Sequence, residues 1–400
     1  MVVAGIIAEY NPFHSGHLKL LNSLRSAGAT HIAVVMSGNF VQRGEAALLS
    51  KWARAKQAVL CGADLVVELP LPWSVAGAEK FASGGISILT ALGADIVGFG
   101  SECGDICKLK SASEALFSAS LHEKIRKELN AGATFAAARQ SAVEELFGKD
   151  TSDLLRHPNN ILGIEYLKAI KKLGSSIEPF TVKRTGASHD ALDPNCNTPS
   201  SRMLRNMIKN NLDFGTFMPE SAYNIIKHEI ESGHAPASLS FIERGILAKL
   251  RMMHKSDFLN LPDISEGLEN RVFASVKRAV TLNELYSLIK TKRYTHARIR
   301  RIILSAFLGI NASFSENSPP YIRVLGIGKN GADILRKTKK ISALPIVTRY
   351  SDIKFLDKRA ADILGLENKA SDIFSLCLPQ AVPCGLDMTA KIITADDSSI

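Results

Sequence analysis

Short apolar runs alternate with longer stretches of helical spacing along the N-terminal part of the chain. The runs are uninterrupted and rich in β-branched residues, which is typical of strands buried on both faces of a parallel sheet. The apolar runs are 1–7, 31–36, 64–69 and 95–100, and the helical stretches between them are 18–24, 50–61 and 79–92. This alternation predicts right-handed βαβ units and hence an α/β fold with a parallel sheet.

The alternation of strands and helices ends near 210–219, and we expect a domain boundary there. Beyond it, 221–309 has the spacing of helices throughout, and 320–378 returns to a pattern of strands and helices. The predicted organisation is an α/β domain at 1–215, followed at 216–400 by a mainly helical region that ends in a small α/β piece.

The composition is that of an ordinary globular protein, with 46% hydrophobic and 22% charged residues. No apolar run approaches the ~20 residues that cross a bilayer, and the N-terminus lacks the features of a signal peptide. A net charge of +10 favours an anionic partner, with nucleic acid the leading candidate.

The cysteines have no spacing typical of a metal site, so we expect no metal ligands among them. Free thiols in a reducing cytoplasm are the simplest interpretation. The cysteines are Cys61, Cys103, Cys107, Cys196, Cys377 and Cys384.

The most specific candidate chemistry lies in the turn that follows the first apolar run. His14 and His17 are three residues apart and therefore share one face of the first turn of the next helix. That turn also presents unpaired N–H groups and the positive end of the helix dipole. Gly16 lets a ligand approach the backbone between the two histidines. A single histidine would be explained as a cap, but two at this spacing predict a phosphate site.

A polar loop at 37–45 follows the second apolar run, next to the histidine turn if the strands have their usual order. Its arginine could pair with a phosphate or a carboxylate in fork geometry. A solvated surface loop is the alternative, but the position favours contact with a substrate. The candidate residues are Ser37, Gly38, Asn39, Gln42 and Arg43.

Glycines at the end of the fourth apolar run form another candidate. Gly98 and Gly100 would let an adenine or a ribose approach the backbone closely. A strand end that needs no side chain explains them equally well.

A second helix N-terminus is predicted at Ser200 and Ser201. Either serine can cap the helix while its hydroxyl and the backbone N–H groups face an anion. Arg205, one turn further, could stabilise charge on the β- and γ-phosphates, and Arg202 could assist. Alone, this segment would be an ordinary cap followed by two surface arginines. Together with the histidine turn, it predicts two helix N-termini that grip one triphosphate and act by placement and charge stabilisation.

A basic cluster in the helical region is the candidate for binding RNA. No acidic residue occurs from 285 to 309, which favours a surface for phosphates over an ordinary solvated helix. The cluster comprises Lys290, Lys292, Arg293, Arg298, Arg300 and Arg301.

A GxGxxG pattern at 326–331, with Asp352 about twenty residues later, matches a dinucleotide fingerprint. Too little chain follows for the further βα units that such a site needs. We therefore interpret the pattern as a tight turn between a strand and a helix.

Several of these segments belong to long blocks that resemble one family. The blocks are GIIAEYNPFHSGH at 5–17, MSGNFVQRGE at 36–45, GFGSE at 98–102, PNNILG at 158–163 and KR at 183–184. They resemble the bacterial tRNA(Met) cytidine acetate ligases of the nucleotidyltransferase-like HxGH superfamily. The C-terminal half is similar mainly in arrangement, with LPIVT at 344–348 in its α/β end.

The resemblance implies a nucleotidyltransferase-like, Rossmann-type domain and a two-step reaction in the cytoplasm. Acetate would attack the α-phosphate of ATP, giving acetyl-adenylate and pyrophosphate. The wobble cytidine of elongator tRNA(Met) would then take the acetyl group, giving N4-acetylcytidine. Mg²⁺ is expected with the triphosphate, and the basic C-terminal half would hold the tRNA.

The resemblance also implies roles for individual residues, with His14, His17 and Arg205 as the catalytic ones. Ser200–Arg205 is similar to the superfamily motif ISSTxIR, with Pro199 in place of the leading Ile, Arg202 in place of Thr and Leu204 in place of the second Ile. The ATP-binding residues would be Ile7, Ala8, Glu9, Tyr10, Asn11, Pro12, Phe13, His14, Ser15, Gly16, His17, Leu18, Lys19, Leu20, Gly100, Asn160, Arg184, Ser200 and Ser201.

Two other functions remain compatible with these residues. One is an adenylyltransferase for a phosphorylated small molecule, which would keep adenylate in its product and have little use for a long basic region. The other is a non-catalytic RNA-binding protein with a nucleotidyltransferase-like fold, against which the intact histidine pair and Arg205 argue.

Overall fold

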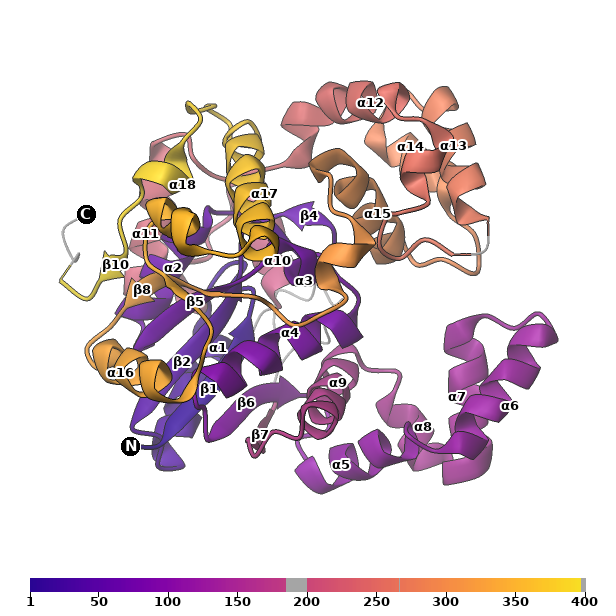
Figure 1. Cartoon of the computed structure of the whole chain (residues 1–400), viewed down its shortest axis with the longest axis horizontal. Helices are drawn as coiled ribbons and strands as arrows, with labels where there is room; N and C mark the ends of the chain where they lie inside the picture. The colour runs from indigo at the N-terminus through magenta and orange to yellow at the C-terminus, as the bar shows by residue number, and fades with distance from the viewer. Residues whose placement is uncertain (185–199, 266, 397–400) are drawn as a thin grey trace.

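The centre of the protein is a mixed sheet with the strand order β10-β8-β5-β2-β1-β6-β7, and β9 pairs with β8 (Figure 1). This computed structural model describes residues 1–184, 200–265 and 267–396. Neighbouring strands are parallel except β5 and β8, which are antiparallel. The strands are β1 (Val3–Ala8), β2 (His31–Ser37), β5 (Leu65–Leu69), β6 (Ile96–Ser101), β7 (Glu178–Lys183), β8 (Ile322–Ile327), β9 (Ile346–Val347) and β10 (Ile393–Thr394). The predicted α/β fold is confirmed.

The central strand β1 is buried on both faces, as its apolar run predicts. Val3 and Ile7 point to the face covered by α4 (Ala78–Ala91) and α9 (Pro158–Leu173). Ala4 and Ile6 point to the opposite face, which α1 (Ser15–Ser26) and α2 (Lys51–Leu60) cover. Alternate side chains of the strand thus pack into two separate hydrophobic layers.

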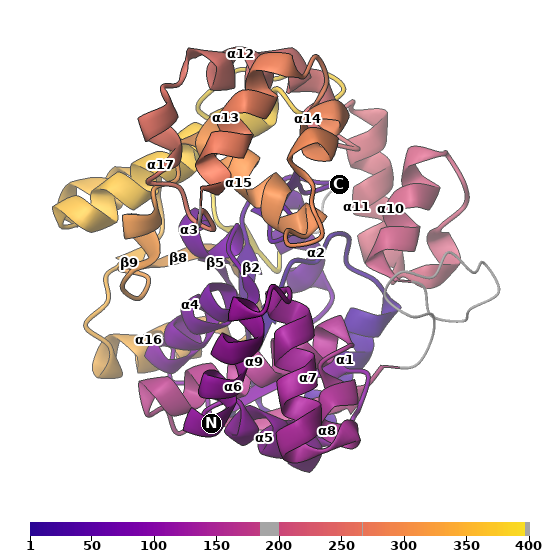
Figure 2. The same ribbon diagram turned by 90° about the vertical axis from the view of Figure 1, so that its right-hand side faces the viewer.

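Two groups of helices extend from this core. In both views, α12–α15 lie in the upper part of the molecule and α5–α8 in the lower part (Figures 1 and 2). The α12–α15 group has its own hydrophobic core, which includes Leu250, Val272, Leu285 and Ile302. The helices are α5 (Ile106–Ala115), α6 (Ala119–Asn130), α7 (Phe135–Phe147), α8 (Lys149–Leu154), α12 (Glu243–Met252), α13 (Leu268–Arg278), α14 (Leu282–Ile289) and α15 (His296–Leu308).

Shorter elements connect these layers. A small hairpin joins β3 (Phe40–Val41) to β4 (Glu45–Ala46). The remaining α-helices are α3 (Leu71–Ser74), α10 (Ser201–Lys209), α11 (Glu220–Glu231), α16 (Gly331–Ile341), α17 (Lys358–Ser375) and α18 (Leu386–Thr389). The 3₁₀ helices are Gly215–Phe217, Leu239–Ile242, Lys255–Phe258, Ala312–Ser315 and Tyr350–Phe355. No helix within the described ranges has both the length and the apolar character to cross a bilayer.

The strands of the small C-terminal α/β piece join the main sheet. Val324 of β8 pairs with Val67 of β5, so the sheet continues from one half of the chain into the other. The GxGxxG glycines explain how closely the halves approach. A Cβ on Gly328 would lie 2.3 Å from the carbonyl oxygen of Ala63, and one on Gly331 would lie 2.0 Å from that of Asp64. The pattern is a tight strand–helix turn, as the sequence predicts.

A buried ion network also joins the two halves. The Lys51 ammonium lies 2.8 Å from the Glu68 carboxylate and 2.6 Å from that of Asp387. Arg323 lies 3.5 Å from Glu68 and 3.3 Å from Asp387. These four side chains are at most 3% exposed. Removing one partner would leave an uncompensated charge in the core, so the network strongly favours this one arrangement of the halves.

Candidate functional site

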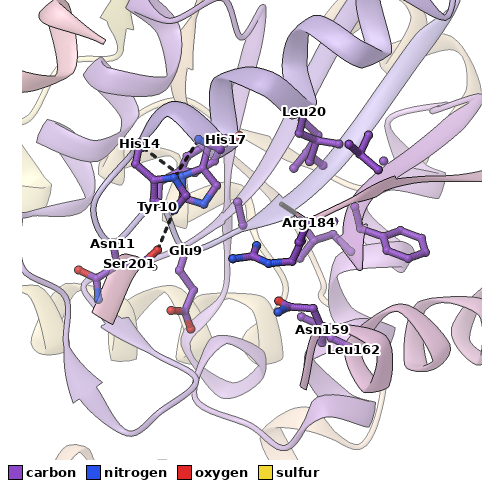
Figure 3. A pocket seen from close by; sticks show the side chains of 18 of the residues that line it. Glu9, Tyr10, Asn11, His14, His17, Leu20, Asn159, Leu162, Arg184 and Ser201 are labelled. Atoms are coloured by element: carbon purple, nitrogen blue, oxygen red, sulfur yellow. Dashed lines mark hydrogen bonds between the residues drawn. The ribbon is translucent and has the colours of Figure 1, made fainter. Parts of the chain in front are cut away.

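A cavity of about 250 Å³ opens where β1, β6 and β7 end, which is where open α/β sheets bind ligands (Figure 3). Its wall is formed by the β1–α1 turn, the ends of β6 and β7, the first turns of α9 and the start of α10. The carboxyl end of β1, the β1–α1 turn and part of the hairpin loop after β2 all reach it. The segments expected to bind a nucleotide therefore meet at one place.

The two histidines form a reciprocal cap at the start of α1. Nδ1 of His14 accepts the N–H of Gly16 at 3.0 Å, and Nδ1 of His17 accepts the N–H of His14 at 3.2 Å. Because a backbone N–H can only donate, both Nδ1 atoms are unprotonated and Nε2 carries the proton of each neutral ring. The rings stack with their centroids 3.8 Å apart. The fold thus presents two N–H donors at the end of a helix.

Both histidines stay neutral at physiological pH. Burial, assisted by the charge of Arg184, lowers the pKa of His14 to about 3. Burial also holds the pKa of His17 well below its usual value, assisted by His14 and Arg184. Neutral imidazoles with a fixed Nε2–H are hydrogen-bond donors, and donors aimed at developing negative charge are an efficient catalytic device.

The second helix N-terminus meets the first at this point. Ser200 caps α10 by accepting the N–H of Met203 at 3.2 Å. Ser201 Oγ lies 3.1 Å from Nε2 of His14. Two positive helix ends therefore face one cavity, the arrangement that the sequence predicts.

Arg205 contacts the histidine turn, although it does not line the cavity. Its Nη1 donates to the carbonyl of Asn11 at 2.7 Å, while Asn11 Oδ1 accepts the N–H of Leu48. Burial lowers the pKa of Arg205, but an arginine remains charged under these conditions. Arg202 is exposed. Pro199 and Cys196 lie outside the described residues, and the five described cysteines are free.

The opposite end of the cavity is built around Arg184. A Cβ on Gly100 would lie 3.2 Å from Cγ of Arg184, so the glycine leaves room for the arginine side chain. Asn160, expected to bind the nucleotide, does not line the cavity; its Oδ1 accepts the N–H of Cys103 at 3.0 Å. The neighbouring Asn159 lines the cavity instead.

The wall also contains several apolar residues that the sequence pattern does not single out. Leu162 and Tyr166 extend the face of α9 that begins at Asn159, and Phe99 packs edge-to-face on Tyr166 with ring centroids 5.6 Å apart. Phe81 adds to this wall from α4. The i, i+3, i+7 spacing of the three α9 residues is the signal that could have identified them.

The polar loop at 37–45 reaches the cavity with only two of its five candidate residues, Gln42 and Arg43. The other three are structural. The carbonyls of Ser37 and Gly38 accept hydrogen bonds from Arg54. Asn39 accepts the N–H of Lys51 at 2.7 Å and donates to Ser371 at 3.1 Å.

The basic cluster is largely engaged within the protein. Arg298 donates to the carbonyl of Asp263 at 2.7 Å, and Arg301 binds the Asp263 carboxylate at 2.7 Å. Arg300 pairs with Glu45. No acidic residue occurs near these arginines in the sequence, but distant segments supply the carboxylates that pair with them. The sequence therefore predicts a more open basic surface than the structure has.

The other members of the basic cluster lie just before α15. Lys290 Nζ donates to the carbonyl of Thr291 at 2.6 Å. Lys292 and Arg293 are the exposed members. RNA binding at this surface stays a prediction, now centred on Lys292 and Arg293.

No group of three or more His, Cys, Asp or Glu side chains that could hold a metal occurs in the described part of the chain. Glu9 is the one carboxylate among the described residues that line the cavity. A Mg²⁺ ion at this site would therefore take most of its ligands from phosphate oxygens and water, as Mg²⁺ commonly does.

Comparison with known proteins shows a similarity that spans nearly all of the chain. The family model described as HIGH Nucleotidyl Transferase matches residues 1–385. The tRNA(Met) cytidine acetate ligase of Thermoanaerobacter sp. (strain X514) is 37% identical over 404 residues, covering 98% of this chain and 100% of that protein. The ligase of the same name from Caldicellulosiruptor saccharolyticus is 40% identical over 390 residues, covering 94% of each.

Solved structures give the same result. Thermotoga maritima TmcAL in its apo form superposes with a TM-score of 0.92 at 32% identity, covering 98% of this chain and 99% of that one. The structure of the same protein bound with alpha-thio ATP gives a TM-score of 0.90 at 32% identity, with the same coverage.

Proposed function

Because this chain belongs to the HIGH nucleotidyl transferases and, within them, to the tRNA(Met) cytidine acetate ligase family, we propose that it acetylates the wobble cytidine of elongator tRNA(Met). Acetate attacks the α-phosphate of ATP, giving acetyl-adenylate and pyrophosphate. The cytidine amine then attacks the acetyl carbonyl, giving N4-acetylcytidine and AMP. The reaction takes place in the cytoplasm, where tRNA and ATP are available.

The observation that carries this proposal is the pair of neutral imidazoles at the meeting point of two helix N-termini. Their Nε2–H groups stabilise the negative charge that develops on the pentavalent α-phosphate, and their depressed pKa values keep them as donors. His14 also touches Ser201 of α10, which aligns both helix dipoles with the phosphate chain. Arg205 adds positive charge for the β- and γ-phosphates from beside Asn11.

The adenosine part lies at the end of the cavity around Gly100, Asn159 and Arg184. The apolar wall of Phe99 and Leu162 offers a surface for the base. Gln42 and Arg43 border the region where acetate enters, and a guanidinium such as that of Arg43 pairs with a carboxylate in fork geometry. Mg²⁺ arrives with the triphosphate and neutralises part of its charge.

The two parts of the chain have different roles in the proposed reaction. Residues 1–215 carry the ATP and acetate chemistry, and residues 216–400 hold the tRNA. The net charge of +10 and the exposed Lys292 and Arg293 support an RNA partner.

One assay tests the proposal against its alternatives. The protein is incubated with ATP, labelled acetate and tRNA(Met), and both the label and AMP are followed. We expect label in the tRNA and release of free AMP. Adenylate retained in a small-molecule product would instead indicate an adenylyltransferase. Absence of both products, with tRNA still bound, would indicate a non-catalytic RNA-binding protein.

A further inference from the structure

Glu9 is an unusual residue in a cavity built for phosphates. It is the one carboxylate among the described lining residues, whereas Lys19, Arg43, Lys183 and Arg184 bring positive charge. The cations match a triphosphate, but a carboxylate repels one. Binding of ATP phosphates therefore does not explain why an acidic side chain lies here.

The carboxylate of Glu9 is fixed in position by its neighbours. The side-chain Oε1 accepts the backbone N–H of Gln42 at 3.0 Å. The backbone carbonyl of Glu9 accepts a hydrogen bond from Nη1 of the buried Arg54 at 2.6 Å. Oε2 accepts no hydrogen bond from any described residue. Figure 3 shows the carboxylate turned away from His14 and His17. Within the described part of the chain, one oxygen is thus held while the other has no protein donor.

An amine is the group that this oxygen fits. A carboxylate is a suitable acceptor for the exocyclic N4 amine of cytosine. Enzymes that modify a base take it out of the stack into a pocket, where hydrogen bonds read its Watson–Crick edge. Tyr166 reaches the cavity wall with little of its ring exposed, and both burial and the charge of Glu9 raise the pKa of its hydroxyl, as expected for close neighbours.

The surroundings of Glu9 also indicate the direction from which the amine arrives. Gln42, which binds Glu9 through its N–H, accepts Nη1 of Arg301 on its carbonyl at 3.4 Å. Glu45 of the same hairpin pairs with Arg300. Glu9 therefore lies on the side of the cavity that borders α15 and the helical region, and the histidine pair lies away from its carboxylate.

We propose that Glu9 binds the N4 amine of the acceptor cytidine and removes its proton in the second half-reaction. This step rests on the acetate ligase function proposed above. The N4 nitrogen forms a bond to the acetyl carbon, and the bond from that carbon to the adenylate oxygen breaks. AMP leaves with the electron pair, and the amine proton passes to the Glu9 carboxylate and then to water.

The test measures the two half-reactions separately in Glu9→Gln. Glutamine keeps the size of the side chain and an oxygen for the Gln42 N–H, but it cannot take a proton. The first half-reaction is followed as acetate-dependent ATP–pyrophosphate exchange. The second is followed as single-turnover transfer of labelled acetyl from enzyme-bound acetyl-adenylate to tRNA. We expect transfer to fall about 10²–10⁴-fold, the usual size for losing a general base, and to fall at least a hundredfold more than exchange.

Two further measurements distinguish a base from a structural residue. The pH profile of the transfer rate should differ between the wild type and Glu9→Gln, because glutamine cannot exchange a proton. Glu9→Asp should restore part of the transfer rate because it restores the base. Glu45→Gln is the matched control: it lies on the same side but outside the cavity, and it should not separate the two steps.

Equal losses in both half-reactions would overturn the proposal, and so would normal transfer in Glu9→Gln. If high Mg²⁺ restored acetyl transfer in Glu9→Gln, Glu9 would be identified as a metal ligand, and the proposal would again be overturned. If the wild-type protein showed no acetate-dependent exchange, the acetate ligase function itself would be refuted. If exchange were normal and Glu9→Gln transferred acetyl at the wild-type rate, only the role of Glu9 would be refuted.

Discussion

Nε2 of His14 lies 3.1 Å from Oγ of Ser201, although the two residues are 187 positions apart in the chain. The contact brings the N-terminus of α10 to the N-terminus of α1. Because each helix end carries partial positive charge, the pair creates an anion site that neither helix forms alone. The histidine is neutral, so the site gains donors without adding a full charge that would have to be desolvated.

His17→Ala should slow formation of acetyl-adenylate about a hundredfold or more, the usual effect of removing one transition-state donor. Acetate-dependent pyrophosphate release measures this step. tRNA binding should be unchanged, which serves as the control for folding. Near wild-type pyrophosphate release by His17→Ala would exclude the assigned role.

Acid should destabilise the folded protein through the histidine pair. The pKa of His14 is lowered to about 3, so between about pH 6.5 and 3 the unfolded chain binds a proton that the folded chain does not. Stability is therefore lost as pH falls through this window, by about 2 kcal/mol or more from His14 at pH 4.5. Urea unfolding at pH 7 and pH 4.5 should show a smaller difference for His14→Gln than for wild type. An equal difference would show that His14 is protonated in the folded state.

Gly100→Ala should weaken ATP binding roughly tenfold, because the new methyl group would lie 3.2 Å from Cγ of Arg184 and displace that side chain. Gly365→Ala is the matched control, since no atom lies within 4 Å of its added Cβ and the position is helical. The control should leave ATP affinity unchanged and slightly raise the melting temperature. Calorimetric titration with ATP measures the first effect, and identical affinities for the two variants would contradict it.

The double variant Lys292→Ala/Arg293→Ala should weaken tRNA binding several-fold and reduce its salt dependence, since both side chains are exposed. Arg301→Ala should act differently, because Arg301 binds the Asp263 carboxylate at 2.7 Å and is 12% exposed. Its main effect should be a lower melting temperature. Filter binding at two salt concentrations and thermal unfolding separate the two classes. A double variant with unchanged salt dependence would remove this surface from the tRNA site.

The sequence predicts the local features of this protein well. Apolar runs identify β1 and β2, and the spacing of His14 and His17 identifies the helix N-terminus that carries them. Both features depend on residues that are neighbours in the chain, so a one-dimensional pattern contains them.

Features that depend on distant partners could not be read in the same way. Arg298 and Arg301 look like a free basic surface until Asp263 is placed beside them. Similarly, the apolar run of β8 indicates a buried strand but not that its neighbour is β5. Asn159 and Asn160 are adjacent and chemically identical, and only the direction of the helix axis decides which of them faces the cavity.

The shared sheet and the Lys51–Glu68–Asp387–Arg323 network have a practical consequence. Expression of the N-terminal half by itself would expose the edge of β5. It would also leave Lys51 and Glu68 without their partners Arg323 and Asp387. Such a fragment should be insoluble. Loss of ATP chemistry after a C-terminal deletion would then report collapse of the catalytic sheet, and it would be a mistake to attribute that loss to a missing tRNA contact.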